Sequence, residues 1–413
     1  MISTKTPQIR FPDFDTEWSI KTIRTYSSKV GSGSTPSGGS KVYQKQGIPF
    51  IRSQNVADNR LDLTDTTFIS SEIHDKMKGS KVKPFDILLN ITGGSIGRSC
   101  VVPSDFKEGN VNQHVCIVRF QDNILPEFAQ AYLSSFNGQK NIMRNQAGGG
   151  REGLNFEAVK DIKLPYTNKE EQQKIADFLS SIDKKITLLK EKHDLLTQYK
   201  KGVMQKLFSQ EIRFNDEAGN DFPDWSNTKF GKVFERVTQK NKEDNQNVLT
   251  ISAQRGLINQ QKYFNKSVSA KDVTGYYLLN NGDFAYNKSY SKGYPMGAIK
   301  RLNNYDKGVV STLYICFKSH GNQHDAFWEQ YFEAGLLNRE ISKIAQEGAR
   351  NHGLLNVSVT EFFKDISVLE PSEKEQIRIS EFLGALDKKL NLVSEQIDHT
   401  QTFKNGLLQQ MFV

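Results

Sequence analysis

The chain has 413 residues, of which 37% are hydrophobic and 10% aromatic, and its formal net charge is +8. Enough apolar surface is present for folded cores, so a wholly disordered chain is excluded, and the length favours two or three domains. No apolar run approaches the roughly 18 residues of a membrane span, and the N-terminal residues lack the apolar core of a signal peptide. Three widely spaced cysteines without a metal-binding pattern fit a reducing compartment, so we expect a cytoplasmic protein without a metal site.

Residues 1–167 predict a first domain of mixed α/β structure. The alternating stretch "HVCIVRF" at 114–120 is typical of a strand, and residues 127–145 have the pattern of a helix. Turns rich in glycine, serine and asparagine separate the other short elements.

Residues 168–208 predict one long helix without proline. Its apolar residues recur with a seven-residue period, which is the pattern of a coiled coil. About 38 residues at 1.5 Å each make a rod of roughly 57 Å, and its apolar seam must be buried on a partner. The residues predicted to form this coiled-coil seam are Ile175, Leu179, Ile182, Ile186, Leu189, Leu196 and Val203.

Residues 209–370 and 371–413 repeat this arrangement. The stretch "TLYICFK" at 312–318 predicts a strand, and residues 326–346 predict a helix in a second mixed domain. The long helix that follows has an equivalent seam, made of Ile379, Leu383, Leu386, Leu390, Val393, Ile397 and Leu407.

The two long helices are copies of one another. Residues 171–208 align with 375–412 without a gap, and fifteen of the 38 positions are identical. The domains before them align far less well, although Trp18 has a counterpart in Trp225. The near-identity of the helices favours their pairing with each other, and the alternative is that each helix packs on its own neighbouring domain. His193 then lies in the seam as a packed residue rather than as a ligand.

Several loops of both domains carry side chains suited to base edges and phosphates, because Arg and Lys bind guanine and phosphate whereas Asn and Gln bind adenine. Ordinary solvated loop polarity is the alternative for each cluster. The candidates are Arg52, Gln54, Asn55, Asn112, Gln113, His114, Arg144 and Arg151 in the first domain, and Gln254, Arg255, Asn287, Lys288, Tyr290, Lys292, Arg350, Asn351 and His352 in the second.

Catalytic motifs are not found. The glycine-rich stretches at 31–41 and 90–99 lack the lysine and the spacing of a phosphate-binding loop. The sequence also lacks a nucleophile elbow, a zinc-protease motif, a nuclease core and the motif of an amino-methyltransferase. It therefore favours a binding protein without catalytic or metal-ligating residues.

Two variable domains and two similar long helices resemble the specificity subunit of type I restriction–modification systems. The resemblance covers essentially the whole chain, and its most specific parts are "EEQQKIADFLSSIDKKI" at 170–186 and "EKEQIRISEFLGALDKKL" at 373–390. The stretches at 7–20 and 212–227 resemble the lead-ins to the family's two target-recognition domains. The stretch at 84–103, with a looser counterpart at 281–299, resembles its mid-domain strand and turn.

The resemblance implies an α+β fold with two target-recognition domains in tandem, each followed by a long helix, and the helices paired as an antiparallel coiled coil. It also implies a non-catalytic subunit whose two domains read the halves of a split DNA target. The coiled coil would set the spacer and dock two adenine-methyltransferase subunits, and motor–nuclease subunits would join them. S-adenosylmethionine, ATP and Mg²⁺ are expected in those partners, and this chain is expected to bind no cofactor and no membrane.

Two other functions stay open on sequence alone. The chain could be a coiled-coil scaffold without a DNA role, or a nuclease or methyltransferase that acts by itself. Neighbouring methyltransferase and helicase–nuclease genes would favour the specificity subunit over the scaffold.

Overall fold

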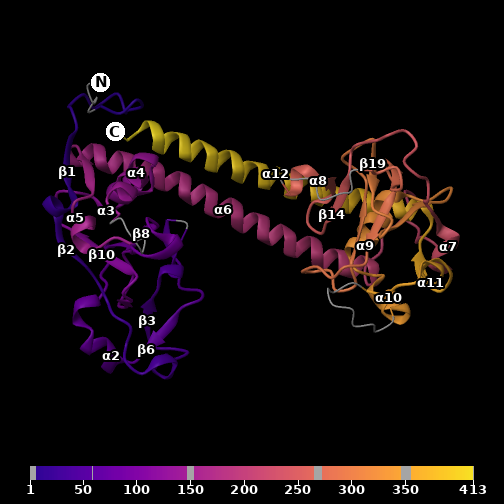
Figure 1. Ribbon diagram of the computed structural model, residues 1–413, viewed down its shortest axis with the longest axis horizontal. Helices are drawn as coiled ribbons and strands as arrows, with labels where there is room; N and C mark the ends of the chain where they lie inside the picture. The colour runs from indigo at the N-terminus through magenta and orange to yellow at the C-terminus, as the bar shows by residue number, and fades with distance from the viewer. Residues whose placement is uncertain (1–5, 58, 147–152, 265–271, 346–354, 413) are drawn as a thin grey trace. The chain divides into compact units, whose positions relative to one another are not determined.

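The computed structural model describes residues 6–57, 59–146, 153–264, 272–345 and 355–412. The chain divides into two compact units, unit 1 (Met1–Glu191 with Ser394–Val413) and unit 2 (Lys192–Val393). Each unit contains one globular head, together with part of α6 (Lys169–Phe208) and part of α12 (Glu373–Gln410), as Figure 1 shows. Among the described residues, no helix has the length and the apolar character needed to cross a membrane.

Head 1, the globular part of unit 1, is built on an antiparallel four-stranded sheet in the order β2-β10-β7-β8. Its inner strand β7 is buried along its whole length. Alternate residues point to opposite faces, so Leu89 and Cys116 face helix α3 while Leu88 and Ile117 face the smaller sheet β6-β3-β9. The strands are β2 (Ser27–Ser32), β10 (Val115–Phe120), β7 (Ile87–Asn90), β8 (Ser99–Val101), β6 (Thr67–Ile69), β3 (Ile48–Ile51) and β9 (Asn110–Val111).

Short elements complete head 1. Strand β1 (Ser19–Thr22) pairs with β11 (Lys163–Tyr166), and β4 (Val56–Ala57) pairs with β5 (Arg60–Leu61). The helix predicted at 127–145 is two helices, because Ser135 adopts an extended conformation and its side chain caps the second of them. The helices are α1 (Ile23–Tyr26), α2 (Ser71–Lys76), α3 (Pro126–Ser134), α4 (Phe136–Arg144) and α5 (Phe156–Lys160).

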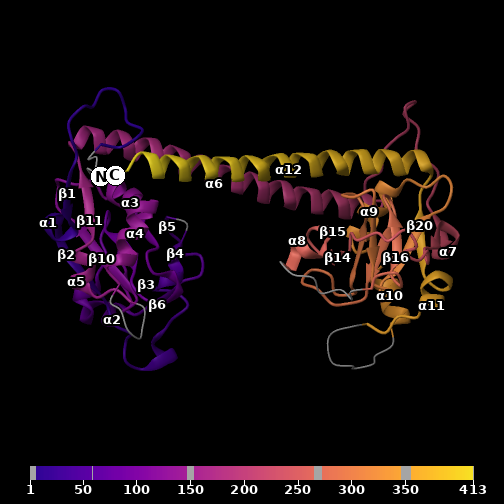
Figure 2. The same ribbon diagram turned by 45° about the horizontal axis from the view of Figure 1, so that its top comes forward.

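Head 2, the globular part of unit 2, has the same central sheet in the order β13-β20-β17-β18, with α9 packed against β18. Figure 2 shows this head, with the inner strand β20 labelled. Its predicted helix at 326–346 is also two helices, and the break contains Gly335 with φ of +73°. The central strands are β13 (Phe234–Arg236), β20 (Ile315–Ser319), β17 (Phe284–Asn287) and β18 (Ala298–Arg301), and the helices are α7 (Phe230–Val233), α8 (Gln260–Phe264), α9 (Asp325–Glu333), α10 (Asn338–Ile344) and α11 (Val359–Lys364).

Three two-stranded ladders surround the central sheet of head 2. Strand β12 pairs with β21 just as β1 pairs with β11 in head 1, so both heads close on a ladder that leads into a long helix. The ladders are β12 (Ser226–Lys229) with β21 (Ser367–Glu370), β14 (Leu249–Ser252) with β15 (Gly256–Asn259), and β16 (Tyr277–Asn280) with β19 (Lys307–Val310).

The two long helices run antiparallel within each unit. In unit 1, Lys404 of α12 donates to Asp183 of α6 at 2.5 Å; in unit 2, Lys200 of α6 donates to Asp387 of α12 at 2.6 Å. Asp183 and Asp387 occupy equivalent positions of the repeat, as do Lys200 and Lys404, so each helix gives its aspartate in one unit and its lysine in the other. All fourteen seam residues predicted from the repeat are buried or half-buried, and His193 is half-buried.

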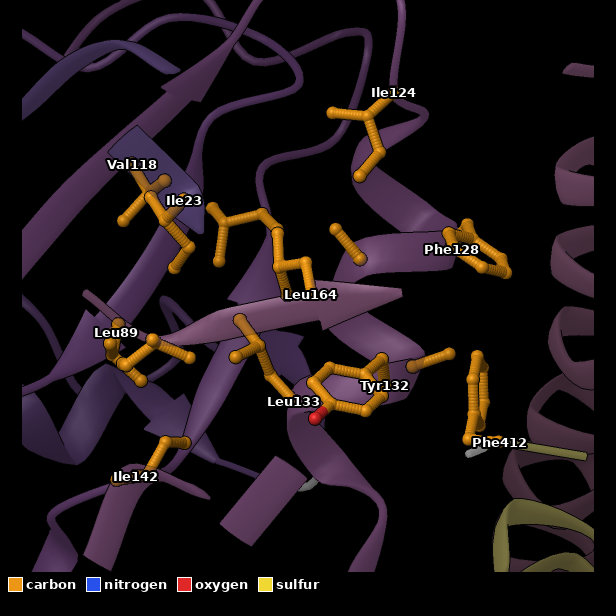
Figure 3. Close-up of a cluster of buried hydrophobic side chains, with 14 of the residues drawn as sticks. Ile23, Leu89, Val118, Ile124, Phe128, Tyr132, Leu133, Ile142, Leu164 and Phe412 are labelled. Carbon is orange, nitrogen blue, oxygen red and sulfur yellow. The ribbon is translucent and has the colours of Figure 1, made fainter. Parts of the chain in front are cut away.

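The C-terminal end of α12 packs into the core of head 1, and the C-terminal end of α6 packs into the core of head 2. Phe412, just past the end of α12, is 3% exposed in unit 1, and its ring lies 5.5 Å from Phe128 and 5.7 Å from Tyr132 (Figure 3). Its counterpart Phe208 lies 5.6 Å from Tyr331 in unit 2. Each head therefore completes its core with the end of the helix from the other repeat: head 1 with the distant end of α12, and head 2 with the end of α6 that directly precedes it.

A buried glutamate at the start of each long helix fixes the chain that leads into the head. Arg10 binds Glu171 at 2.6 and 2.8 Å, and the Trp18 indole donates to the same carboxylate at 3.1 Å. Burial alone would raise the pKa of Glu171, but the hydrogen bonds from Arg10, Thr167 and Trp18 outweigh it and hold that pKa below its usual value. In unit 2 the same contacts join Arg213, Trp225 and Glu375.

The aromatic ring at position 412 provides a test of this crossed packing. We expect Phe412→Ala to lower the unfolding free energy of unit 1 by about 3–5 kcal/mol, because a large buried ring is lost. Phe403→Ala is the matched control, since Phe403 is 57% exposed on the same helix and its loss should cost under about 0.5 kcal/mol. Calorimetric unfolding measures both, and equal effects would contradict the packing.

Two equivalent buried aspartates differ in their partners. Arg119 donates to both oxygens of Asp86 at 2.7 Å, whereas Asp283 accepts a hydrogen bond from the Asn280 backbone at 2.8 Å. Burial raises the pKa of Asp283 above its ordinary value, and the charge of Lys318 offsets this only in part.

This difference predicts opposite responses to the same substitution. An aspartate whose pKa is higher in the folded than in the unfolded chain stabilises the folded state at pH values below its unfolded pKa of about 3.9. This stabilisation is lost as the pH rises. We therefore expect D283N to be more stable than the native chain at pH 7 and the gap to close toward pH 4. D86N should instead lose about 1.5–3 kcal/mol at pH 7, because the Arg119 guanidinium loses its carboxylate. Denaturant unfolding from pH 4 to 8 measures both, and a D283N loss matching that of D86N would refute this account.

Candidate nucleic-acid interface

In head 1, several candidate residues gather at the edge where β7 ends and β10 begins. Asn90 is paired with Val115 across the two strands, so the loops that follow one and precede the other lie side by side. A chain of side-chain hydrogen bonds crosses this edge, from Thr35 to Gln113 at 2.6 Å, on to His114 at 3.1 Å and from His114 to Thr92 at 2.6 Å. Gln113 is exposed, and the chain of bonds fixes the orientation of its amide.

Two of the predicted asparagines support loops instead of facing solvent. Asn112 is 7% exposed, and its side-chain oxygen accepts from the His114 backbone at 3.0 Å. Asn55 is 2% exposed, and its amide bonds the backbone of Arg52 and Asp62 at 2.9 Å each. These residues shape the edge through the backbone that they hold.

The other candidates of head 1 are distributed around this edge. Arg52 is half-buried and Gln54 is exposed, in and beside the short turn η2 (Ser53–Asn55), which Asn90 contacts through the Ser53 carbonyl at 2.9 Å. Arg144 is exposed in the last turn of α4. Arg151 lies outside the described residues.

In head 2 the equivalent edge carries a longer loop, residues 288–297, between β17 and β18. The loop is fastened at several points: Tyr286 donates to the Met296 carbonyl at 2.7 Å, and Leu355 donates to the Lys288 carbonyl at 2.9 Å. Tyr294 donates to Glu333, and Lys300 bonds the Tyr294 hydroxyl at 2.9 Å. Burial, and then the neighbouring Glu333 carboxylate, raise the pKa of Tyr294, so this tyrosine stays a neutral donor.

The fastened loop presents an aromatic ring and cations to solvent. Tyr290 is 64% exposed, Lys292 is exposed in the tight turn closed by Ser291 and Tyr294, and Lys288 is half-buried. Asn287 accepts from the Ser289 backbone at 3.1 Å and so shapes the loop.

The remaining candidates of head 2 lie elsewhere. Gln254 and Arg255 are exposed in the turn between β14 and β15. Arg350, Asn351 and His352 lie outside the described residues.

The geometry suits binding better than chemistry. Head 1 presents fixed hydrogen-bonding groups at this edge, and head 2 presents an aromatic ring and lysines, which are the groups that contact bases and phosphates. Within the described part of the chain, no group of three or more His, Cys, Asp and Glu side chains is placed to hold a metal ion.

Sequence reasoning missed residues that fasten these edges. Thr35 and Thr92 hold Gln113 and His114, and Lys300 and Glu333 hold Tyr294. These partners lie 6 to 78 positions from the residues they hold, so no local pattern indicates them. Leu313 was also missed, because it lies within the stretch 312–318 predicted as a strand; β20 begins only at Ile315, and Leu313 is 66% exposed in the turn before it.

Comparison with known proteins finds similarity to specificity subunits of type I restriction systems. A family model described as the type I restriction modification DNA specificity domain matches residues 18–198. The EcoBI specificity subunit of Escherichia coli is 31% identical over 43% of this chain and 38% of its own length. The MjaIX specificity subunit of Methanocaldococcus jannaschii is 24% identical over 52% of this chain and 51% of its own, so the chain spans about half or less of these two relatives.

Longer matches extend over both halves. The StySPI specificity subunit of Salmonella potsdam is 22% identical over 88% of this chain and 80% of its own length. The solved S subunit from M. genitalium has the same fold with a TM-score of 0.59, 14% identity and 99% coverage of both chains. A structure from work on the assembly of a type I system gives a TM-score of 0.51, 12% identity and coverage of 96% and 97%.

The fold predicted from the repeat is thereby confirmed as that of a two-headed subunit with paired helices. Over residues 18–198 this chain is similar to the DNA specificity domain of type I restriction–modification systems, and the matched relatives are specificity subunits of such systems.

Proposed function

We propose that this chain reads a split, asymmetric DNA target, one half with each head, and directs methylation and restriction carried out by partner subunits. The observation that carries the proposal is that two heads share one frame yet differ at the same edge. The Glu171 and Glu375 anchors and the central sheets are equivalent, whereas Gln113 and His114 stand where head 2 has Leu313 and the loop 288–297. Equal frames with unequal edges suit two different half-sites.

The antiparallel helices support a role as a spacer and as a platform. Each of α6 and α12 contributes residues to both units, and we propose that the paired helices set the spacer between the two half-sites. The adenine-methyltransferase and motor–nuclease subunits would supply S-adenosylmethionine, ATP and Mg²⁺ chemistry. A chain that reads the chromosome would work in the cytoplasm.

Exposed apolar residues recur at equivalent positions of the two helices and support the docking of two identical partners. Leu188 and Leu392 are 54% and 58% exposed, and Tyr199 and Phe403 are 54% and 57% exposed. Leu188 and Phe403 belong to unit 1, whereas Leu392 and Tyr199 belong to unit 2. Each unit thus presents one leucine and one aromatic ring outside the seam, and paired exposed apolar residues mark an interaction surface.

The target specificity is tested by deleting the gene and sequencing the adenine methylation of the host genome. We expect one split motif to lose its methylation on deletion and to regain it when the gene is restored. A methylated split motif that survives deletion would show that another chain sets its specificity, and would favour the scaffold function.

The docking surface is tested by charge substitution at equivalent positions. We expect L188E and L392E each to remove one of two methyltransferase copies, because a charge in an apolar contact costs about 1–3 kcal/mol or more, and the double variant to remove both. Leu195→Glu is the matched control, since Leu195 is 65% exposed but its counterpart is His399. Native mass spectrometry of the tagged complex gives the copy number, and loss of both copies in either single variant would contradict two independent sites.

A further inference from the structure

The turn that precedes the middle strand has the same construction in both heads. In head 1 it is the three residues 112–114 before β10, and in head 2 the four residues 311–314 before β20. Its first residue bonds the backbone two positions on: Asn112 accepts from His114 at 3.0 Å, and Ser311 accepts from Leu313 at 3.3 Å. Such a bond fixes a turn without help from distant residues.

Strand pairing places both turns at the same edge of the sheet. Val115 is paired with Asn90 in head 1, and Ile315 is paired with Tyr286 in head 2. The turn therefore stands next to the loop that follows β7 or β17, at the edge that carries the candidate DNA-binding residues. A turn mounted on the middle of a four-stranded sheet is a rigid support for a side chain that must meet a base.

The apex of this turn has opposite chemistry in the two heads. Gln113 is held by Thr35 and His114, and its amide keeps one further lone pair on the oxygen and one further N–H on the nitrogen. Leu313 is 66% exposed and belongs to none of the hydrophobic clusters of the described residues. Most of the Leu313 side chain therefore stays in water in the free chain, and an apolar contact in a complex would remove that surface from water.

These two side chains match two different base edges. A glutamine amide pairs with the N6–H and N7 of adenine, and an apolar side chain packs on the 5-methyl group of thymine in the major groove. The neighbouring Lys288 and Lys292 are cations suited to phosphates on either side of such a contact. We propose that this turn is a specificity-determining element in each head, with Gln113 reading an adenine in one half-site and Leu313 reading a thymine methyl in the other.

This inference rests on the proposed function and names the base contacts within it. The test of head 2 uses the complex recovered from the host through a tagged copy of the chain, on duplexes carrying its methylated motif. Replacing a single thymine of the second half-site by uracil removes one methyl group, and we expect binding to weaken about fourfold at one position. With L313A, the same replacement should have no effect. Because Leu313 is exposed, this variant keeps its fold.

The test of head 1 is the reciprocal one. We expect Q113A to weaken binding to the native half-site about 5- to 150-fold, which is the range for one two-point amide contact. Replacing one adenine by 7-deazaadenine should then not weaken binding by Q113A any further. Gln121→Ala is the control, because Gln121 is an exposed glutamine just past the opposite end of β10, and it should leave the response to 7-deazaadenine unchanged.

The outcomes separate this inference from the proposed function. If no split motif depends on the gene, the proposed function itself fails. If the motif depends on the gene but binding by L313A remains as sensitive to uracil as that of the native chain, the DNA role stands and the assignment of Leu313 is overturned. If L313A leaves the motif unchanged and lowers the number of bound subunits, Leu313 contacts a protein partner and the inference is likewise overturned.

Discussion

The burial of one apolar seam along each long helix is the constraint on which the rest of this structure depends. A helix of about 40 residues with a single apolar stripe is unstable in water until the stripe is covered. Each buried leucine or isoleucine contributes about 1.5–3 kcal/mol, so the seams outweigh any single contact of the heads. Because α6 and α12 carry the same seam, they cover one another, and the reciprocal Asp183–Lys404 and Lys200–Asp387 pairs select the antiparallel register.

The crossed ends of the helices make the heads depend on this pairing. Phe412 completes the core of head 1 and Phe208 completes the core of head 2, although each residue belongs to the repeat that contains the other head. Neither core is complete from its own segment of sequence, so folding of a head and pairing of the helices are coupled. A head therefore cannot separate from the helix end that it holds without exposing its core.

The two heads share a frame and differ at one edge of the central sheet. Both heads have the same central sheet, a buried glutamate anchor, and a serine or asparagine whose side chain starts the turn. These shared groups support the fold. The side chains at the apex of each turn do not affect the core, so they can differ. In head 1 the Gln113 amide accepts a hydrogen bond from Thr35 and donates one to His114, whereas head 2 fastens a longer loop through Tyr294, Lys300 and Glu333.

The amino-acid sequence by itself determined the tandem organisation and the seams of the helices, and it indicated the proteins to which the chain is similar. The seven-residue period and the gapless repeat are local signals, and they predicted residues such as Ile182 and Leu386 as interior, where both are buried. Only the tertiary structure decided which loops meet. Strand pairing joins Asn90 to Val115 across 25 positions, and side-chain packing joins Phe412, just past the end of α12, to head 1. It also separated the loop-supporting Asn55 and Asn112 from the exposed Gln113 and Leu313, since burial depends on contacts that no local pattern records.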